Sequence, residues 1–132
     1  MPIDGISHVS LTVADLERSK RWYAQVLEWN SVMDDRSDTT SFSYGTLPDG
    51  TTIVLRVHDD PAEAVFDERR SGLDHLSLTA TDPEDLAAVE ARLRELGAEY
   101  TPVHDMGFGQ ILAFRDPDNI ALELFYTSPP PP

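Results

Sequence analysis

The chain contains one short pattern twice, and this internal repeat constrains the fold more than any other feature of the sequence. Residues 8–15 read HVSLTVAD and residues 75–82 read HLSLTATD, so five of the eight positions are identical at an offset of 67 residues (75 − 8). Both copies are apolar at alternate positions, which is typical of a β-strand with one buried face. The repeat therefore predicts two modules of similar architecture along one chain.

A helical pattern follows each copy of the repeat. After the second copy, Asp82 is placed as the N-cap residue, Pro83 as the first helical residue and Gly97 as the residue just beyond the helix. After the first copy, Asp15 opens the helical stretch 16–29. Helical spacing predicts that these apolar residues form the buried faces: Trp22, Val26 and Trp29 in the first helix, and Leu86, Val89, Leu93 and Leu96 in the second.

Three further strands are expected after each helix, and a turn precedes the last strand of each set. The turns are Pro48-Asp49-Gly50 and Asp116-Pro117-Asp118-Asn119. The expected strands are residues 30–35, 39–47 and 51–58 in the first half, and 99–103, 109–115 and 120–126 in the second. Each half thus reads strand–helix–strand–strand–strand.

The fold class that follows is α+β, built from two βαβββ modules. At 132 residues the chain is expected to form a single domain. Module one covers about residues 5–60 and module two about 72–127, with a polar connector at about 59–71. Residues 128–132 are expected to form an exposed, disordered proline-rich tail.

Composition narrows the class of protein. A net charge of −14 disfavours binding to nucleic acid or to an anionic membrane. No apolar run approaches the ~20 residues of a membrane-spanning helix, and the N-terminus has no signal-peptide pattern. The chain has no cysteine, which suits the reducing cytoplasm and leaves histidine and carboxylate as metal ligands.

Alternation along the strands places polar side chains together. His8 and His75 fall on the polar faces of the two repeated strands, beside serine and threonine. Glu123 interrupts the apolar strand IALELFY and points to the face opposite Leu122 and Leu124. A carboxylate in such a strand needs a partner, a proton or a metal. Two histidines and one carboxylate are a common ligand set for first-row metals, so we favour metal binding over two hydrogen-bonded histidines and a solvent-facing glutamate.

The segments HVSLTVADLERSKRWY, DHLSLTATD and FRDPDNIALELFY resemble the vicinal oxygen chelate superfamily, also called the glyoxalase/bleomycin-resistance/dioxygenase family. The resemblance covers about residues 5–127. It implies a mixed sheet that curls around a metal or ligand cleft, with helices outside, commonly in homodimers. Matched residue by residue, it implies that His8, His75 and Glu123 are the metal ligands.

Departures from the family pattern reduce the number of activities that the resemblance supports. Glyoxalase I-type members have a fourth ligand at the position that Val54 or Leu55 holds here, and neither binds metal, so that activity is disfavoured. The basic residues of the fosfomycin-resistance enzymes are not recognisable between Tyr100 and Arg115. His104 precedes Glu123 by 19 residues (123 − 104), similar to a substrate-side histidine of extradiol dioxygenases, although the tyrosine of those enzymes is replaced here.

The resemblance therefore favours an enzyme, with iron(II) preferred and manganese, nickel or zinc as alternatives. It implies a small oxygenated substrate chelated to the metal and a dioxygenase-like, isomerase or lyase reaction. His104 and His58 are candidate catalytic residues. The candidate residues for the apolar wall are Phe42, Tyr44, Phe108, Phe114 and Phe125. The alternative is a protein that sequesters an antibiotic or aromatic metabolite without catalysis.

Overall fold

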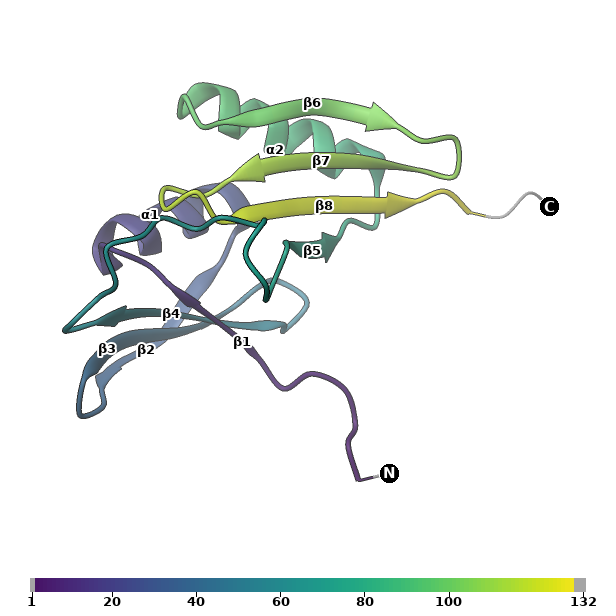
Figure 1. Ribbon diagram of the computed structural model, residues 1–132. Coiled ribbons are helices and arrows are strands. Elements are labelled where there is room, and N and C mark those ends of the chain that lie inside the picture. The colour runs from purple at the N-terminus through teal and green to yellow at the C-terminus, as the bar shows by residue number, and fades with distance from the viewer. Residues whose placement is uncertain (1, 130–132) are drawn as a thin grey trace. The chain divides into compact units, whose positions relative to one another are not determined.

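The computed structural model describes residues 2–129, and the chain divides into two compact units, Met1–Glu63 (unit 1) and Ala64–Pro132 (unit 2). Both contain one helix and four strands in the order β-α-β-β-β (Figure 1). Unit 1 comprises β1 (Val9–Thr12), α1 (Leu16–Leu27), β2 (Asn30–Arg36), β3 (Thr40–Thr46) and β4 (Thr52–His58). Unit 2 comprises β5 (Leu76–Thr79), α2 (Pro83–Glu95), β6 (Tyr100–Asp105), β7 (Gly109–Arg115) and β8 (Ala121–Thr127). The α+β class with two βαβββ modules is confirmed.

Each unit has its own four-stranded mixed sheet, and the strand orders are equivalent: β1-β4-β3-β2 and β5-β8-β7-β6. The first strand of each unit pairs in parallel with the last strand, and the other neighbours are antiparallel. Ser10 lies opposite Val54 in unit 1, and its repeat equivalent Ser77 lies opposite Glu123 in unit 2. Val54, rather than Leu55, is therefore the counterpart of Glu123, and unit 1 has no carboxylate at this place.

The helix ends follow the local sequence signals. Asp15 accepts a hydrogen bond from the backbone N–H of Arg18 at 3.0 Å, and Asp82 accepts one from Glu84 at 2.8 Å. Gly97 adopts φ 64°, where glycine has no steric penalty. Backbone bonds from Gly97 to Arg94 and from Ala98 to Leu93 complete a Schellman motif at the end of α2.

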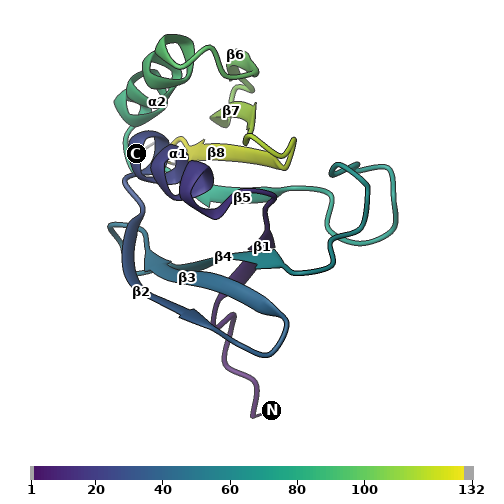
Figure 2. The ribbon, with the colours of Figure 1, turned by 90° about the vertical axis from the view of Figure 1, so that its left-hand side faces the viewer.

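One side of each helix packs against its own sheet. In unit 1, α1 contacts β3 and β4 (Figure 2), and in unit 2, α2 contacts β6, β7 and β8. The predicted buried faces are largely confirmed by these buried side chains: Trp22, Val26, Trp29, Leu86, Val89 and Leu93. Neither helix has the length and apolar character to cross a membrane, which holds for residues 2–129.

Two details of the sequence prediction were wrong. The first helix ends at Leu27, so Trp29 follows it and donates its indole N–H to the carbonyl of Ile53 at 3.0 Å. Leu96 is 44% exposed. It is the C-cap residue of α2 and lies beyond the last helical residue, so its side chain no longer follows the buried face of the helix. Phe114, one of the expected wall residues, is 3% exposed and lies opposite the buried Leu122. Residues 130–132 of the expected tail lie outside the described residues.

Gly45 on β3 is expected to tolerate no side chain. A Cβ atom at this position would lie 2.3 Å from two atoms of the Trp29 ring, which is itself buried and hydrogen-bonded. Overpacking of this kind costs about 1–3 kcal/mol, so Gly45→Ala should lower the free energy of unfolding by about 3 kcal/mol in urea titrations. The same substitution should cost less in a Trp29→Phe background, because the smaller ring removes the contact with the indole, although the Cβ atom still lies 2.6 Å from the backbone oxygen of Asn30. Additive effects of the two substitutions would contradict this explanation.

Candidate metal centre and pocket

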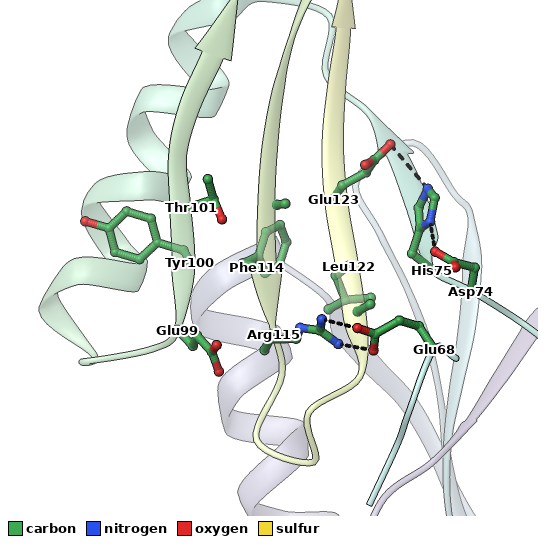
Figure 3. A pocket seen from close by; sticks show the side chains of 12 residues that line it. Glu68, Asp74, His75, Glu99, Tyr100, Thr101, Phe114, Arg115, Leu122 and Glu123 are labelled. Atoms are coloured by element: carbon green, nitrogen blue, oxygen red, sulfur yellow. Dashed lines mark hydrogen bonds and ion pairs between the residues drawn. The ribbon is translucent and has the colours of Figure 1, made fainter. Parts of the chain in front are cut away.

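The structure brings together two of the three expected metal ligands, both in unit 2. His75 immediately precedes β5, and Glu123 lies in the middle of the neighbouring strand β8. The His75 Nε2 atom and the Glu123 Oε1 atom are 3.6 Å apart, and the two side chains point toward each other (Figure 3). Glu123 is 18% exposed, so its carboxylate is largely withdrawn from solvent. A distance of 3.6 Å is too long for a direct hydrogen bond.

Asp74 fixes the orientation of the His75 ring. Its Oδ1 atom lies 2.7 Å from His75 Nδ1 (Figure 3). A proton on Nδ1 is therefore donated to Asp74, and the lone pair of Nε2 is directed toward Glu123. The hydrogen bond that His75 donates to Asp74, followed by the negative charge of Glu123, raises the pKa of His75 above its ordinary value against the opposing effect of partial burial.

This arrangement fits a divalent metal ion. Two ligand atoms that are each about 2.1 Å from one ion lie about 3.0–3.4 Å apart, close to the separation between His75 and Glu123. A carboxylate–histidine pair of the type formed by Asp74 and His75 is the usual outer support of a metal-binding imidazole. Within residues 2–129, however, no cluster of three or more His, Asp or Glu side chains is placed to hold an ion.

The third expected ligand, His8, belongs to unit 1 and repeats the local arrangement of His75. It immediately precedes β1, and its Nδ1 atom lies 3.0 Å from the hydroxyl of Ser7. Ser7 and Asp74 are equivalent in the repeat, so in both units the preceding side chain contacts Nδ1. Sequence analysis did not single out these two residues, although the paired dipeptides Ser-His and Asp-His at the repeat offset were the available signal.

His104 is turned toward the Glu123 face of the unit 2 sheet by a β-bulge. On β6, Thr101 lies opposite Ala113 and His104 lies opposite Ile111, with the register shifted between them. Ala113 lies opposite Glu123. Without the extra residue, His104 would point to the other face, because side chains alternate along a strand. The bulge thus keeps His104 available as a candidate substrate-side residue.

His58, the second candidate catalytic histidine, ends β4 in unit 1 and is exposed, with Thr40 opposite it on β3. Among the expected wall residues, Phe108 is 58% exposed, and its ring centroid lies 6.3 Å from that of Phe125. Phe125 is two residues from Glu123 and therefore shares its face of the sheet.

His75 and Glu123 line a pocket of about 320 Å³. At its edge, Arg115 on β7 donates two hydrogen bonds of 2.8 Å to the carboxylate of Glu68 in the connector (Figure 3). The side-chain amide of Asn119 also donates to the carbonyl of Phe66 at 3.0 Å. These bonds fasten the connector to the β7–β8 turn. The pocket is lined by Glu68, Asp74, His75, Glu99, Tyr100, Thr101, Ala113, Phe114, Arg115, Ala121, Leu122 and Glu123.

The Glu68–Arg115 pair should survive strong acid. The hydrogen bonds from Arg115 lower the pKa of Glu68 from 4.5 to about 2. Because the pKa is lower in the folded protein, the stabilisation is present above the ordinary pKa and is lost only as the pH falls through about 2. We expect an NMR titration of the Glu68 carboxyl carbon to show its midpoint near that value, and near the ordinary value in Arg115→Gln. A midpoint near 4.5 in the unaltered protein would contradict the pairing.

The sequence is similar to those of known proteins. A model of the Glyoxalase/Bleomycin resistance protein/Dioxygenase superfamily matches residues 5–124. A catechol-2,3-dioxygenase from Bacillus subtilis is 28% identical over 127 residues, which are 94% of this chain but 42% of that protein. The chain therefore spans less than half the length of this relative.

Solved structures show the same fold. A glyoxylase/bleomycin resistance protein/dioxygenase domain from Frankia sp. EAN1pec is 52% identical, with a TM-score of 0.92 over 96% of this chain and 93% of that one. The fosfomycin resistance protein FosX from Listeria monocytogenes, in a complex with Mn(II) and sulfate, is 20% identical with a TM-score of 0.73 over 96% of this chain and 94% of that one. At that identity the likeness concerns the fold alone.

Proposed function

Because the chain belongs to the Glyoxalase/Bleomycin resistance protein/Dioxygenase superfamily, we propose that it is a metal-dependent enzyme acting on a small oxygenated organic substrate. The metal ligands in this proposal are His8, His75 and Glu123. The observation that carries it is the His75–Glu123 pair, in which Asp74 occupies Nδ1 and leaves Nε2 directed at the carboxylate. The two facing ligand atoms are 3.6 Å apart, a separation that one ion can bridge.

When bound, a divalent ion would act as a Lewis acid and chelate two oxygen atoms of the substrate. The residues of the chain have separate tasks around it. Asp74 holds the proton on Nδ1 of His75, so that Nε2 stays a lone-pair donor. Glu123 supplies negative charge inside the pocket, and Glu68 with Arg115 holds the connector at the pocket edge. His104 is placed on the Glu123 face, where an imidazole can give or take a substrate proton.

A dioxygenase-like reaction with iron(II) is the preferred form of this proposal. It is supported by the two-histidine, one-carboxylate ligand set, which is typical of non-haem iron enzymes, and by the similarity to the catechol-2,3-dioxygenase. An isomerase or lyase reaction with manganese, nickel or zinc is the alternative. Val54 stands in unit 1 where Glu123 stands in unit 2, so no fourth protein ligand is available there, which disfavours glyoxalase I activity.

Elemental analysis of the anaerobically purified protein tests the proposal. We expect about one iron, manganese, nickel or zinc per chain. Oxygen uptake with catechols then tests the dioxygenase form, and isomerase and lyase assays test the alternative. If the protein binds no metal even after reconstitution, yet retains an antibiotic or aromatic metabolite unchanged, the enzyme proposal is wrong and the protein is a sequestering one.

The expected cytoplasmic homodimer is also part of this proposal. Mixing two inactive variants, His8→Ala and Glu123→Ala, tests whether one centre takes ligands from two chains. If it does, a mixed dimer contains one centre with all three ligands and regains about half of the metal. If each centre uses one chain only, mixing restores none. Sedimentation analysis of the unaltered protein provides the control for the assembly itself.

A further inference from the structure

Arg56 has an unusual position on the sheet of unit 1. It lies on β4, opposite Thr12 on β1 and Phe42 on β3. His8 and Ser10 precede Thr12 by four and two residues, so alternation places them on the same face as Arg56. The guanidinium group is therefore on the face of unit 1 that carries the proposed metal ligand His8.

Three contacts hold the guanidinium in a fixed orientation. Its Nη1 atom donates a hydrogen bond of 2.6 Å to the hydroxyl of Thr40, and Nε donates a longer one of 3.4 Å to Ser10. Its central carbon lies 4.6 Å from the centre of the Phe42 ring, within cation–π range. Thr40 is itself 5% exposed and is bonded to Ser37 through both its hydroxyl and its backbone carbonyl. The anchor of Arg56 is thus rigid.

Within the described residues, Arg56 has no carboxylate partner, although acidic residues outnumber basic ones 24 to 10 in the chain. Two of its five N–H donors are used by hydroxyl groups, which leaves three without a protein acceptor in that part of the chain. Other arginines are neutralised by a carboxylate, as in Arg36–Asp59, Arg69–Asp67, Arg94–Glu90 and Arg115–Glu68. A half-buried guanidinium with unused, oriented donors is suited to an incoming anion.

Large apolar side chains lie on the same face as Arg56, on β3 and β2. Phe42 lies beneath the guanidinium, and Tyr44 and Met33 follow on the same face, 36% and 49% exposed. One opposing charge shares this face: Asp35, which lies opposite Phe42 and accepts a bond from the backbone of Arg36. The combination of one guanidinium group and three large apolar side chains matches a ligand with an aromatic or aliphatic part and one carboxylate.

We propose that Arg56 is a specificity-determining residue that binds the carboxylate of an aromatic or otherwise apolar acid, with Phe42, Tyr44 and Met33 against its apolar part. As an assignment of substrate class, this rests on the proposed function. The binding of the acid itself does not require the metal. Thr40 is a positioning residue in this arrangement, because it touches Arg56 and orients the free donors.

Calorimetric titration with benzoate and with its neutral analogue benzamide tests the inference. The unaltered protein should bind benzoate more tightly than benzamide. Arg56→Gln should weaken benzoate binding roughly 10–100-fold, the range of charge-assisted hydrogen bonds, and leave benzamide binding unchanged. Thr40→Val should weaken benzoate binding less, while Asp35→Asn should strengthen it. Arg36→Gln is the matched control, since Arg36 is already paired with Asp59, and it should have no effect.

Metal content separates this inference from the proposed function. Arg56→Gln should keep the metal content of the unaltered protein, and Glu123→Gln should lose metal yet still bind benzoate. Failure of benzoate to bind the unaltered protein, equal binding by Arg56→Gln, or loss of binding in Glu123→Gln would overturn the inference. If Arg56→Gln does not fold, Thr40→Val and Asp35→Asn decide the question: unchanged benzoate affinity in both would overturn it.

Discussion

Glu123→Gln is expected to abolish stoichiometric metal retention. The substitution keeps the shape of the side chain but removes the negative charge and one strong oxygen ligand beside His75. Loss of an outer partner of a metal ligand typically lowers affinity about 10–100-fold, and loss of a ligand itself should exceed that. Elemental analysis after dialysis against a weak chelator should give about one metal per chain in the unaltered protein and almost none in the variant.

The matched control for Glu123→Gln is Glu99→Gln. Glu99 lines the same pocket and carries the same charge, but it belongs to the segment before β6 rather than to the His75–Glu123 pair. It should retain metal. If both variants lose metal equally, the effect comes from the general negative charge of the pocket. If Glu123→Gln retains a full complement, Glu123 is not a ligand.

Asp74→Asn is expected to lower metal affinity about 10–100-fold without removing a ligand. The amide of asparagine presents its oxygen or its NH₂ group to Nδ1 and no longer stabilises one tautomer by charge, so Nε2 is a less basic and less well oriented donor. Competition titrations with a metal-binding dye at pH 8 measure this effect. Asp85→Asn, in the first turn of α2, is the control.

The pH dependence distinguishes the role of Asp74 from a general structural one. Asp74 raises the pKa of His75, so in the metal-free protein protons compete with metal at a higher pH than usual. In Asp74→Asn this pKa falls, and the loss of affinity should be largest at high pH and smaller at low pH. A loss of affinity that is constant across pH would show that Asp74 does not act through His75.

Most of the fold could be predicted because its signals are local. The repeated strand pattern, the N-caps Asp15 and Asp82 and the glycine at position 97 act over a few residues, and each element formed where they indicated. The helix ends were less certain. Leu96 has helical spacing with the buried residues of α2, yet it is exposed. Burial at a helix end depends on where the helix stops and on which residues pack there, and the spacing of apolar residues does not predict either.

The sequence by itself also predicted that His75 and Glu123 lie on strand faces directed into the same cleft, because side-chain alternation is enough to assign faces. It did not reveal the contacts that depend on partners far away along the chain. Examples are the Glu68–Arg115 pair, 47 residues apart, and the bond from Arg56 to Thr40, 16 residues apart. The bulge that turns His104 toward the Glu123 face was equally invisible.

The difference between the features that the sequence predicts and the contacts that it does not reveal has a physical cause. Periodicity and capping express the preferences of neighbouring residues, so a sequence determines which strands and helices form and which face of each is polar. Whether a charged side chain is neutralised, or stands oriented with unused donors, depends on strand order and register across a sheet. The sequence thus determined the two modules and the polar face of His8, His75 and Glu123. Only the tertiary structure decided that Asp74 orients His75 and that Arg56 has no carboxylate partner in the described part of the chain.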